Sequence, residues 1–123
     1  MKLLLDTHTF LWLVEGSPNL SAGAQAALAD SANELFLSVA SIREMAIKIG
    51  NNKLILGEAL DAFVEIWTVA YEVRMLPIHT SHALAVVGLP SSHSDPFDRM
   101  LVAQGQVETM TLATADSKLS LFS

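Results

Sequence analysis

Short apolar segments of strand length alternate with longer segments of helical period, and this alternation most limits what the chain can fold into. We expect strands at residues 3–5, 35–39, 73–78 and 110–114. We expect helices at residues 7–14, 21–30, 58–71, 81–87 and 95–104, and one that opens at Ser41 and stops at residues 50–52. A terminal helical turn is expected after Asp116. Strands that alternate with helices are joined by right-handed crossovers into a mostly parallel sheet. The sequence therefore predicts an α/β fold.

The composition limits the size and surroundings of the fold. A chain of 123 residues fits one core, so we expect a single domain over residues 1–123. Hydrophobic residues make up 51% of the chain, more than one small core readily hides, so we expect a partner at the apolar helices of residues 7–14 and 58–71. The absence of cysteine excludes disulfides and thiolate metal sites. Charged residues interrupt every apolar run and no secretory signal is visible, so we expect a cytoplasmic protein without membrane contact.

The formal net charge of −6 argues against a protein that grips nucleic acid through a broad basic face. Phosphate contacts from lysine and arginine supply most of the non-specific affinity for nucleic acids. A nuclease with this composition therefore needs another source of positive charge at its site.

Four acidic residues stand where a predicted strand ends or a predicted helix begins. They are Asp6, Glu44, Asp98 and Asp116. In an open parallel sheet the carboxyl ends of the strands face one side of the sheet, and ligands bind there. We therefore expect the four carboxylates to converge on one site.

Each acid also has a local structural explanation. Glu44 could bond the backbone of Ser41 in a capping box, or pair with Lys48 one helical turn later. Asp95 is a plausible N-cap, and Asp98 would then lie in the first turn, where the helix dipole favours an anion. The other two acids could cap the helices that follow them. Taken singly, capping is the more common role, but four such positions in one fold favour a shared site.

Carboxylates brought close together repel one another, and a bound cation makes the arrangement tolerable. Oxygen ligands suit Mg²⁺ or Mn²⁺, which also accept phosphate oxygens as ligands. Such ions would activate water and neutralise charge on a scissile phosphodiester, so no histidine base is required. They would also supply the positive charge that the composition lacks.

Other polar residues have weaker functional readings. His79 and His82 could share a helix face and bind zinc, but the sequence places no third nitrogen ligand beside them, so ordinary histidines are the preferred reading. His93 could contact substrate. Arg99 could contact phosphate, orient an acid or form a structural ion pair, and Thr114 could hold a carboxylate or water near the last acid, or do nothing.

The chain resembles PIN-domain ribonucleases, and within them VapC-type toxins, over nearly its whole length. The resemblance rests on an ordered set of segments: Leu4-Leu5-Asp6-Thr7-His8, Ser38-Val39-Ala40-Ser41-Ile42-Arg43-Glu44, His93-Ser94-Asp95-Pro96-Phe97-Asp98-Arg99, Leu101-Val102-Ala103-Gln104, and Leu112-Ala113-Thr114-Ala115-Asp116.

The resemblance implies a three-layer α/β/α domain with a mostly parallel central sheet, a homodimer, and a small antitoxin protein that fills the site. It also implies an endoribonuclease whose metal-activated water leaves a 3′-hydroxyl and a 5′-phosphate on the cleaved RNA. The Mg²⁺ or Mn²⁺ would be held by acids matching Asp6, Glu44, Asp98 and Asp116. Asp95 competes with Asp98 for the third acidic position, and we favour Asp98 because it stands three residues before an apolar run, as in the family pattern.

Two other classes of protein fit the sequence less well. An aspartyl-phosphate phosphatase would usually have a second aspartate two residues after Asp6, where this chain has His8. The stronger alternative is a catalytically inactive PIN-like module that binds protein or RNA, against which the retention of all four acids counts.

Overall fold

The computed structural model describes residues 1–90 and 95–114. The strands are β1 (Lys2–Leu5), β2 (Glu34–Ser38), β3 (Val73–Leu76) and β4 (Thr111–Ala113). The helices are α1 (Thr7–Glu15), α2 (Ala22–Ala29), α3 (Val39–Gly50), α4 (Leu60–Ala70), α5 (Thr80–Ala85) and α6 (Pro96–Glu108), with a short 3₁₀ helix, η1 (Val86–Gly88), after α5. Strands and helices alternate as the sequence pattern predicts.

The described strands form one parallel sheet in the order β3-β2-β1-β4. The first strand lies inside the sheet, and its Leu4 stands opposite Phe36 of β2 on one side and Leu112 of β4 on the other. The prediction of an α/β fold with a mostly parallel sheet is confirmed. Because β4 returns to the far side of β1, the winding of the chain reverses between these two strands.

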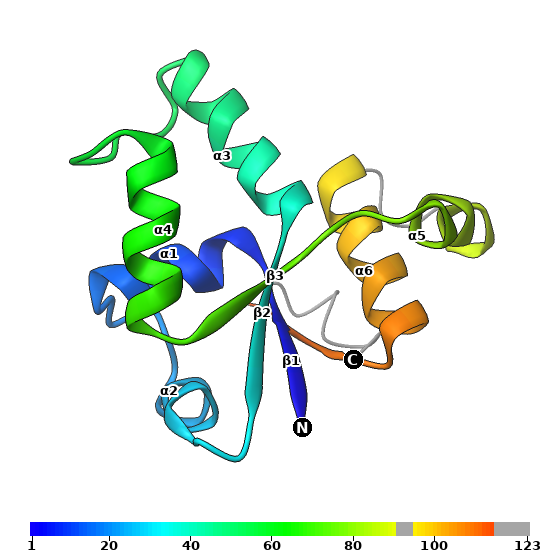
Figure 1. Ribbon diagram of the computed structural model, residues 1–123, viewed down its shortest axis with the longest axis horizontal. Coiled ribbons are helices and arrows are strands. Elements are labelled where there is room, and N and C mark those ends of the chain that lie inside the picture. Colours follow the sequence, from blue (N-terminus) through cyan, green and yellow to red (C-terminus); the bar gives the residue numbers. More distant parts are fainter. Residues whose placement is uncertain (91–94, 115–123) are drawn as a thin grey trace.

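Helices cover both faces of the sheet, which gives three layers (Figure 1). Helices α1, α2 and α4 lie on one side of the strands, and α5 and α6 lie on the other. Successive side chains of β1 point to opposite faces. Leu3 and Leu5 therefore join the core with Phe10 and Phe63, whereas Leu4 packs in the second core with Leu101. A short strand that is apolar on both faces is what a sheet buried between two helical layers requires.

Helix α3 starts two residues earlier than the sequence pattern predicts. Its N-cap is Ser38, whose Oγ accepts a hydrogen bond from the backbone N–H of Ala40 at 3.0 Å. The predicted opening at Ser41 is wrong, because Ser38 at the end of β2 already caps the helix. Glu44 therefore lies in the second turn of α3, and not in the first.

Helix α6 runs past Gly105, where the sequence pattern predicts its end. A Cβ built at Gly105 would lie 3.3 Å from the carbonyl oxygen of Met110, so the glycine lets β4 begin close to the helix. The turn is closed by a hydrogen bond of 2.9 Å from the Met110 N–H to the Gly105 oxygen. Thr109 ends α6 in the left-handed conformation, with φ of 56°. The terminal helical turn predicted after residue 114 lies outside the described residues.

The two apolar helices expected to meet a partner differ in exposure. Helix α1 buries Phe10 and Leu11 in the core, and none of its large apolar side chains is exposed. Helix α4 buries Phe63 but leaves Ile66 50% and Val69 73% exposed. Of the two helices, α4 is therefore the one with apolar surface to cover. No helix within residues 1–90 and 95–114 is long and apolar enough to cross a membrane.

Candidate active site

The candidate site lies at the carboxyl ends of β1 and β4, where the order of the strands reverses. Crevices at such switch points are where open α/β sheets bind ligands. Asp6 follows β1 directly and Thr114 follows β4 directly. The Thr114 hydroxyl donates a hydrogen bond to Oδ2 of Asp6, so the two strand ends are joined at the site. Of the two readings left open for Thr114, the structure shows the one in which it holds a carboxylate.

Asp6 is 7% exposed and is also the N-cap of α1. Its Oδ1 accepts a hydrogen bond of 2.7 Å from the backbone N–H of Thr9, while Oδ2 accepts from Thr114. The side chain is thus fixed on both oxygens by residues of two different elements.

Glu44 reaches the same site from α3. Its Oε1 accepts a hydrogen bond of 2.6 Å from the Thr7 hydroxyl at the start of α1, and its Oε2 lies 2.9 Å from Nζ of Lys48. The pairing with Lys48 is confirmed, and the predicted capping box with Ser41 is wrong because both glutamate oxygens have other partners. Ser41 Oγ is buried and has no hydrogen-bond partner within the described part of the chain.

Asp95 and Asp98 begin α6. Oδ1 of Asp95 accepts hydrogen bonds from the backbone N–H groups of Phe97 at 2.8 Å and Asp98 at 3.1 Å, so Asp95 is the N-cap, as predicted. Asp98 lies in the first turn and is partly buried. The cap of α6 is therefore supplied by Asp95 and not by Asp98.

These side chains line one pocket of about 420 Å³. Its lining residues are Asp6, Thr7, His8, Trp12, Glu44, Lys48, Asp95 and Asp98. The structure thus brings together three of the four acids singled out in the sequence, together with the competing acid Asp95. The fourth, Asp116, lies outside the described residues. Among residues 1–90 and 95–114, no three acidic or histidine side chains are close enough to hold one metal ion together.

The donor chemistry of the pocket nevertheless fits a hard divalent cation. Carboxylate and hydroxyl oxygens are the ligands that Mg²⁺ and Mn²⁺ prefer, and the acids come from three separate elements. Oε2 of Glu44 now faces a lysine ammonium, which is itself a cation at a carboxylate oxygen. The pocket therefore already accommodates positive charge at one of the four acids.

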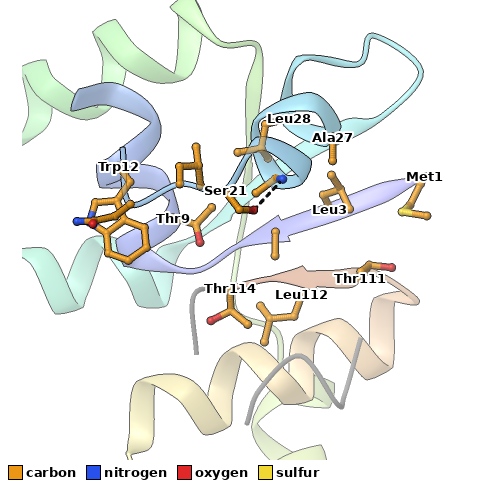
Figure 2. A pocket seen from close by; sticks show the side chains of 14 residues that line it. Met1, Leu3, Thr9, Trp12, Ser21, Ala27, Leu28, Thr111, Leu112 and Thr114 are labelled. Atoms are coloured by element: carbon orange, nitrogen blue, oxygen red, sulfur yellow. Dashed lines mark hydrogen bonds between the residues drawn. The ribbon is translucent and has the colours of Figure 1, made fainter. Parts of the chain in front are cut away.

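A larger pocket of about 830 Å³ lies beside β4 and is mainly apolar (Figure 2). Thr9 and Trp12 of α1 border it on one side, and Thr111 and Leu112 of β4 on the other (Figure 2). Among the described residues, its lining contains no carboxylate, lysine or histidine side chain and so offers no acid, base or metal ligand for phosphodiester chemistry. The smaller acidic pocket is therefore the candidate active site.

The histidines of the zinc alternative have a structural role. His82 is fully buried; its Nδ1 accepts from the backbone N–H of His79 at 3.0 Å, and its Nε2 lies 2.7 Å from Oε2 of Glu108. Because Nδ1 is an acceptor, Nε2 carries the proton and donates to Glu108. Both ring nitrogens of His82 are engaged within the fold, in agreement with the preferred reading of an ordinary satisfied histidine.

Arg99 also has structural partners. Its guanidinium donates hydrogen bonds to the backbone carbonyl oxygens of Pro90 at 2.8 Å and Val86 at 3.0 Å. It therefore ties η1 and the residues after it to the start of α6. His93, for which a substrate contact was considered, lies outside the described residues.

Sequence reasoning missed three residues of the acidic pocket: Thr7, His8 and Trp12. Thr7 and His8 directly follow Asp6, so their place at the start of α1 could have been inferred. Trp12 stands four residues after His8, on the same face of the helix, and the two rings lie 6.1 Å apart. Because the Trp12 side chain is largely apolar, its sequence pattern indicates a core residue and gives no sign of its position at the pocket.

The PIN domain family model matches residues 3–122, so the chain belongs to the PIN-domain family. Members of this family are generally nucleases and typically use divalent metal ions. The solved structure of VapBC-1 from nontypeable Haemophilus influenzae is similar in fold, with a TM-score of 0.63 and 16% sequence identity over 99% of this chain and 92% of that one. No curated protein matches the sequence.

Proposed function

We propose that this protein is a metal-dependent endoribonuclease that acts as the toxin of a toxin-antitoxin pair. The observation that carries the proposal is the acidic pocket, whose lining Asp6, Glu44 and Asp98 reach from three separate elements at the switch point of the sheet.

The residues proposed to hold the metal ion are Asp6, Glu44, Asp98 and Asp116, with Mg²⁺ or Mn²⁺ as the ion. When bound, such an ion activates water and neutralises charge on the scissile phosphate. The surrounding residues hold the proposed ligands in place: Thr114 and the N-terminus of α1 hydrogen-bond Asp6.

Thr7 has a comparable positioning role for Glu44. Its hydroxyl bonds Oε1 of Glu44 across 37 positions of the sequence and ties the start of α1 to α3. Side chains held in this way lose little conformational freedom when a ligand binds, and such preorganisation favours tight and specific geometry.

An antitoxin and a second copy of the chain are the proposed protein partners. Support for the antitoxin comes from the fold similarity to VapBC-1, and support for further protein contact comes from large apolar side chains left exposed. Among the described residues these include Ile55 at 89%, Val87 at 86%, Val69 at 73% and Leu84 at 67%. Light scattering that gives the mass of one chain at high micromolar concentration would contradict the homodimer.

The test of the proposed activity is cleavage of an end-labelled single-stranded RNA by purified protein, with Mg²⁺ or Mn²⁺ and with excess chelator. We expect cleavage only with metal, and products that carry a 5′-phosphate and a 3′-hydroxyl. These end groups distinguish the reaction from contaminating ribonucleases that attack through the 2′-hydroxyl and leave a cyclic phosphate. Undiminished cleavage in chelator would refute the metal mechanism.

Asp6→Asn provides the matched variant, because asparagine also caps helices well and so preserves the start of α1. It removes the charge at the centre of the pocket. We expect cleavage to fall by roughly two orders of magnitude or more, since the metal generates the nucleophile and stabilises the phosphate charge. If the protein is instead an inactive binding module, wild type and variant will bind RNA alike and neither will cleave it.

A further inference from the structure

Lys48 has an unusual position for a lysine at an acidic site. Its Nζ lies 2.9 Å from Oε2 of Glu44, and both side chains are largely covered, with 31% of Lys48 and 14% of Glu44 exposed. The other oxygen of Glu44 accepts the 2.6 Å hydrogen bond from Thr7. Both oxygens of this proposed metal ligand are therefore occupied by donors of the protein itself.

A metal ion at Glu44 would place two cations on one carboxylate. Like charges at such a distance repel strongly in a partly buried site, so the ammonium would leave Oε2 as the metal binds. The Lys48 side chain is flexible, because its charge lies at the end of a four-carbon stem with several rotatable bonds. The ion pair is also partly exposed, and such pairs contribute little to stability and exchange readily.

The released ammonium would stay beside the pocket, because Lys48 is one helical turn from Glu44 on the same face of α3. Among the described residues that line the pocket, Lys48 is the only lysine or arginine. The four acids of that lining repel the phosphates of an entering RNA. A mobile cation at this position has an anionic partner available as soon as substrate arrives.

We propose that Lys48 exchanges partners during function: it neutralises Glu44 before the metal binds, and it contacts an RNA phosphate afterwards. This inference rests on the proposed ribonuclease activity and adds a substrate-binding residue to it. The alternative is an ordinary helix-surface pair between positions i and i+4, for which neither metal affinity nor RNA affinity depends on Lys48.

The test uses Lys48→Met, which keeps an unbranched side chain of nearly the same length and removes its charge, and Lys48→Arg, which keeps the charge. Lys53→Met is the control, because Lys53 is exposed, lies just beyond α3 and is absent from the lining of the pocket, while its loss changes the net charge equally. Calorimetric titration with Mn²⁺, without RNA, measures the competition at Glu44. We expect Lys48→Met to bind Mn²⁺ more tightly by up to about fivefold, the equivalent of a partly exposed ion pair. Equal or weaker binding than in Lys53→Met would overturn the competition.

Steady-state cleavage measures the second role. We expect Lys48→Met to raise KM roughly tenfold and to leave kcat nearly unchanged. The reason is that the lost charged contact is made equally in the bound substrate and in the transition state. The slope of log KM against log salt concentration should fall by about 0.7, because one phosphate contact to a single strand is lost. Lys48→Arg should retain most of the affinity. A KM and salt slope equal to those of Lys53→Met would overturn the phosphate contact.

The two proposals can fail separately. If wild-type protein neither binds Mn²⁺ nor cleaves RNA, the proposed function fails and this inference fails with it. If wild type does both and Lys48→Met matches Lys53→Met in both assays, only the role of Lys48 is refuted.

Discussion

Neutralising Asp98 has different consequences for a carboxylate that only stabilises α6 and for one that binds a metal ion. The helix already has its N-cap, because Asp95 accepts from two backbone N–H groups of the first turn. In the structural reading, Asp98 stabilises α6 through the helix dipole. Such an interaction is worth about 0.3 to 1 kcal/mol, and its loss in Asp98→Asn would lower the free energy of unfolding by that amount.

The acidic pocket adds an effect of opposite sign. Asp98 shares the lining with Asp6, Glu44 and Asp95, so removing its charge relieves repulsion when no metal is present. We expect the two effects to offset each other to within about 0.5 kcal/mol. For a domain of 123 residues, 1 kcal/mol corresponds to a change in Tm of about 4 °C. The metal-free variant should then melt within about 2 °C of wild type.

Added metal separates the two roles more clearly. At a concentration of Mn²⁺ one hundred times Kd, binding to the native state stabilises a protein by about 2.7 kcal/mol, or roughly 10 °C here. Wild type should gain this shift, and Asp98→Asn should gain little of it. Cleavage of RNA should fall in the variant by orders of magnitude.

Two further variants serve as controls in the same melting and cleavage assays. Asp61→Asn removes an acid from the first turn of α4, away from the acidic pocket, so it should lose dipole stabilisation but keep the Mn²⁺ shift. Asp95→Ala removes the cap of α6, and because it also removes a charge from the acidic pocket, Tm should fall by at most about 4 °C. The reasoning is refuted if Asp98→Asn behaves as Asp61→Asn does, with a lower metal-free Tm, a full Mn²⁺ shift and normal cleavage.

Two predictions concern the frame around the site. Ser38→Ala should lower the free energy of unfolding by about 2 to 4 kcal/mol in urea denaturation. The substitution removes the α3 cap and leaves the buried Oε1 of Gln104 without its 2.6 Å hydrogen bond. A loss below about 0.5 kcal/mol would contradict this account. Gly23→Ala, at a helical position with open space around it, should raise Tm by about 4 °C. Gly105→Ala should raise Tm less or lower it, because the new Cβ would crowd the Met110 oxygen at 3.3 Å. Equal gains in the two glycine variants, measured by thermal melting, would show that the Met110 carbonyl moves aside without penalty.

The order and type of the elements could be predicted because local patterns determine them. Short apolar runs such as residues 3–5 read as strands, and helical periodicity marks segments such as residues 58–71. The exact ends were less predictable where a contact between distant residues decides them. Ser38 is a case in point: its hydroxyl serves both the N-cap of α3 and a buried bond to Gln104, 66 positions away. Gly105 is another, because its role depends on where β4 starts.

The sequence was enough to predict which acids form the site, but not which residues hydrogen-bond them. A parallel sheet brings the ends of its strands together, so the position of each acid after a strand or at a helix start was enough to place Asp6, Glu44 and Asp98 in one pocket. The hydroxyl donors Thr7 and Thr114 required the register of the fold. No local pattern tells which distant carboxylate a threonine will reach.

Capping and ligand binding are alternative roles for each acid, and Asp6 shows why they need not exclude one another. A carboxylate has two oxygens. Oδ1 of Asp6 caps α1 through Thr9, while Oδ2 turns to the end of β4 and bonds Thr114. The cap fixes the rotamer of the side chain, and this leaves the second oxygen at a defined place in the site. A helix that begins directly after a strand can thus use one residue both to start itself and to aim a ligand, so evidence of capping at such a position does not count against function.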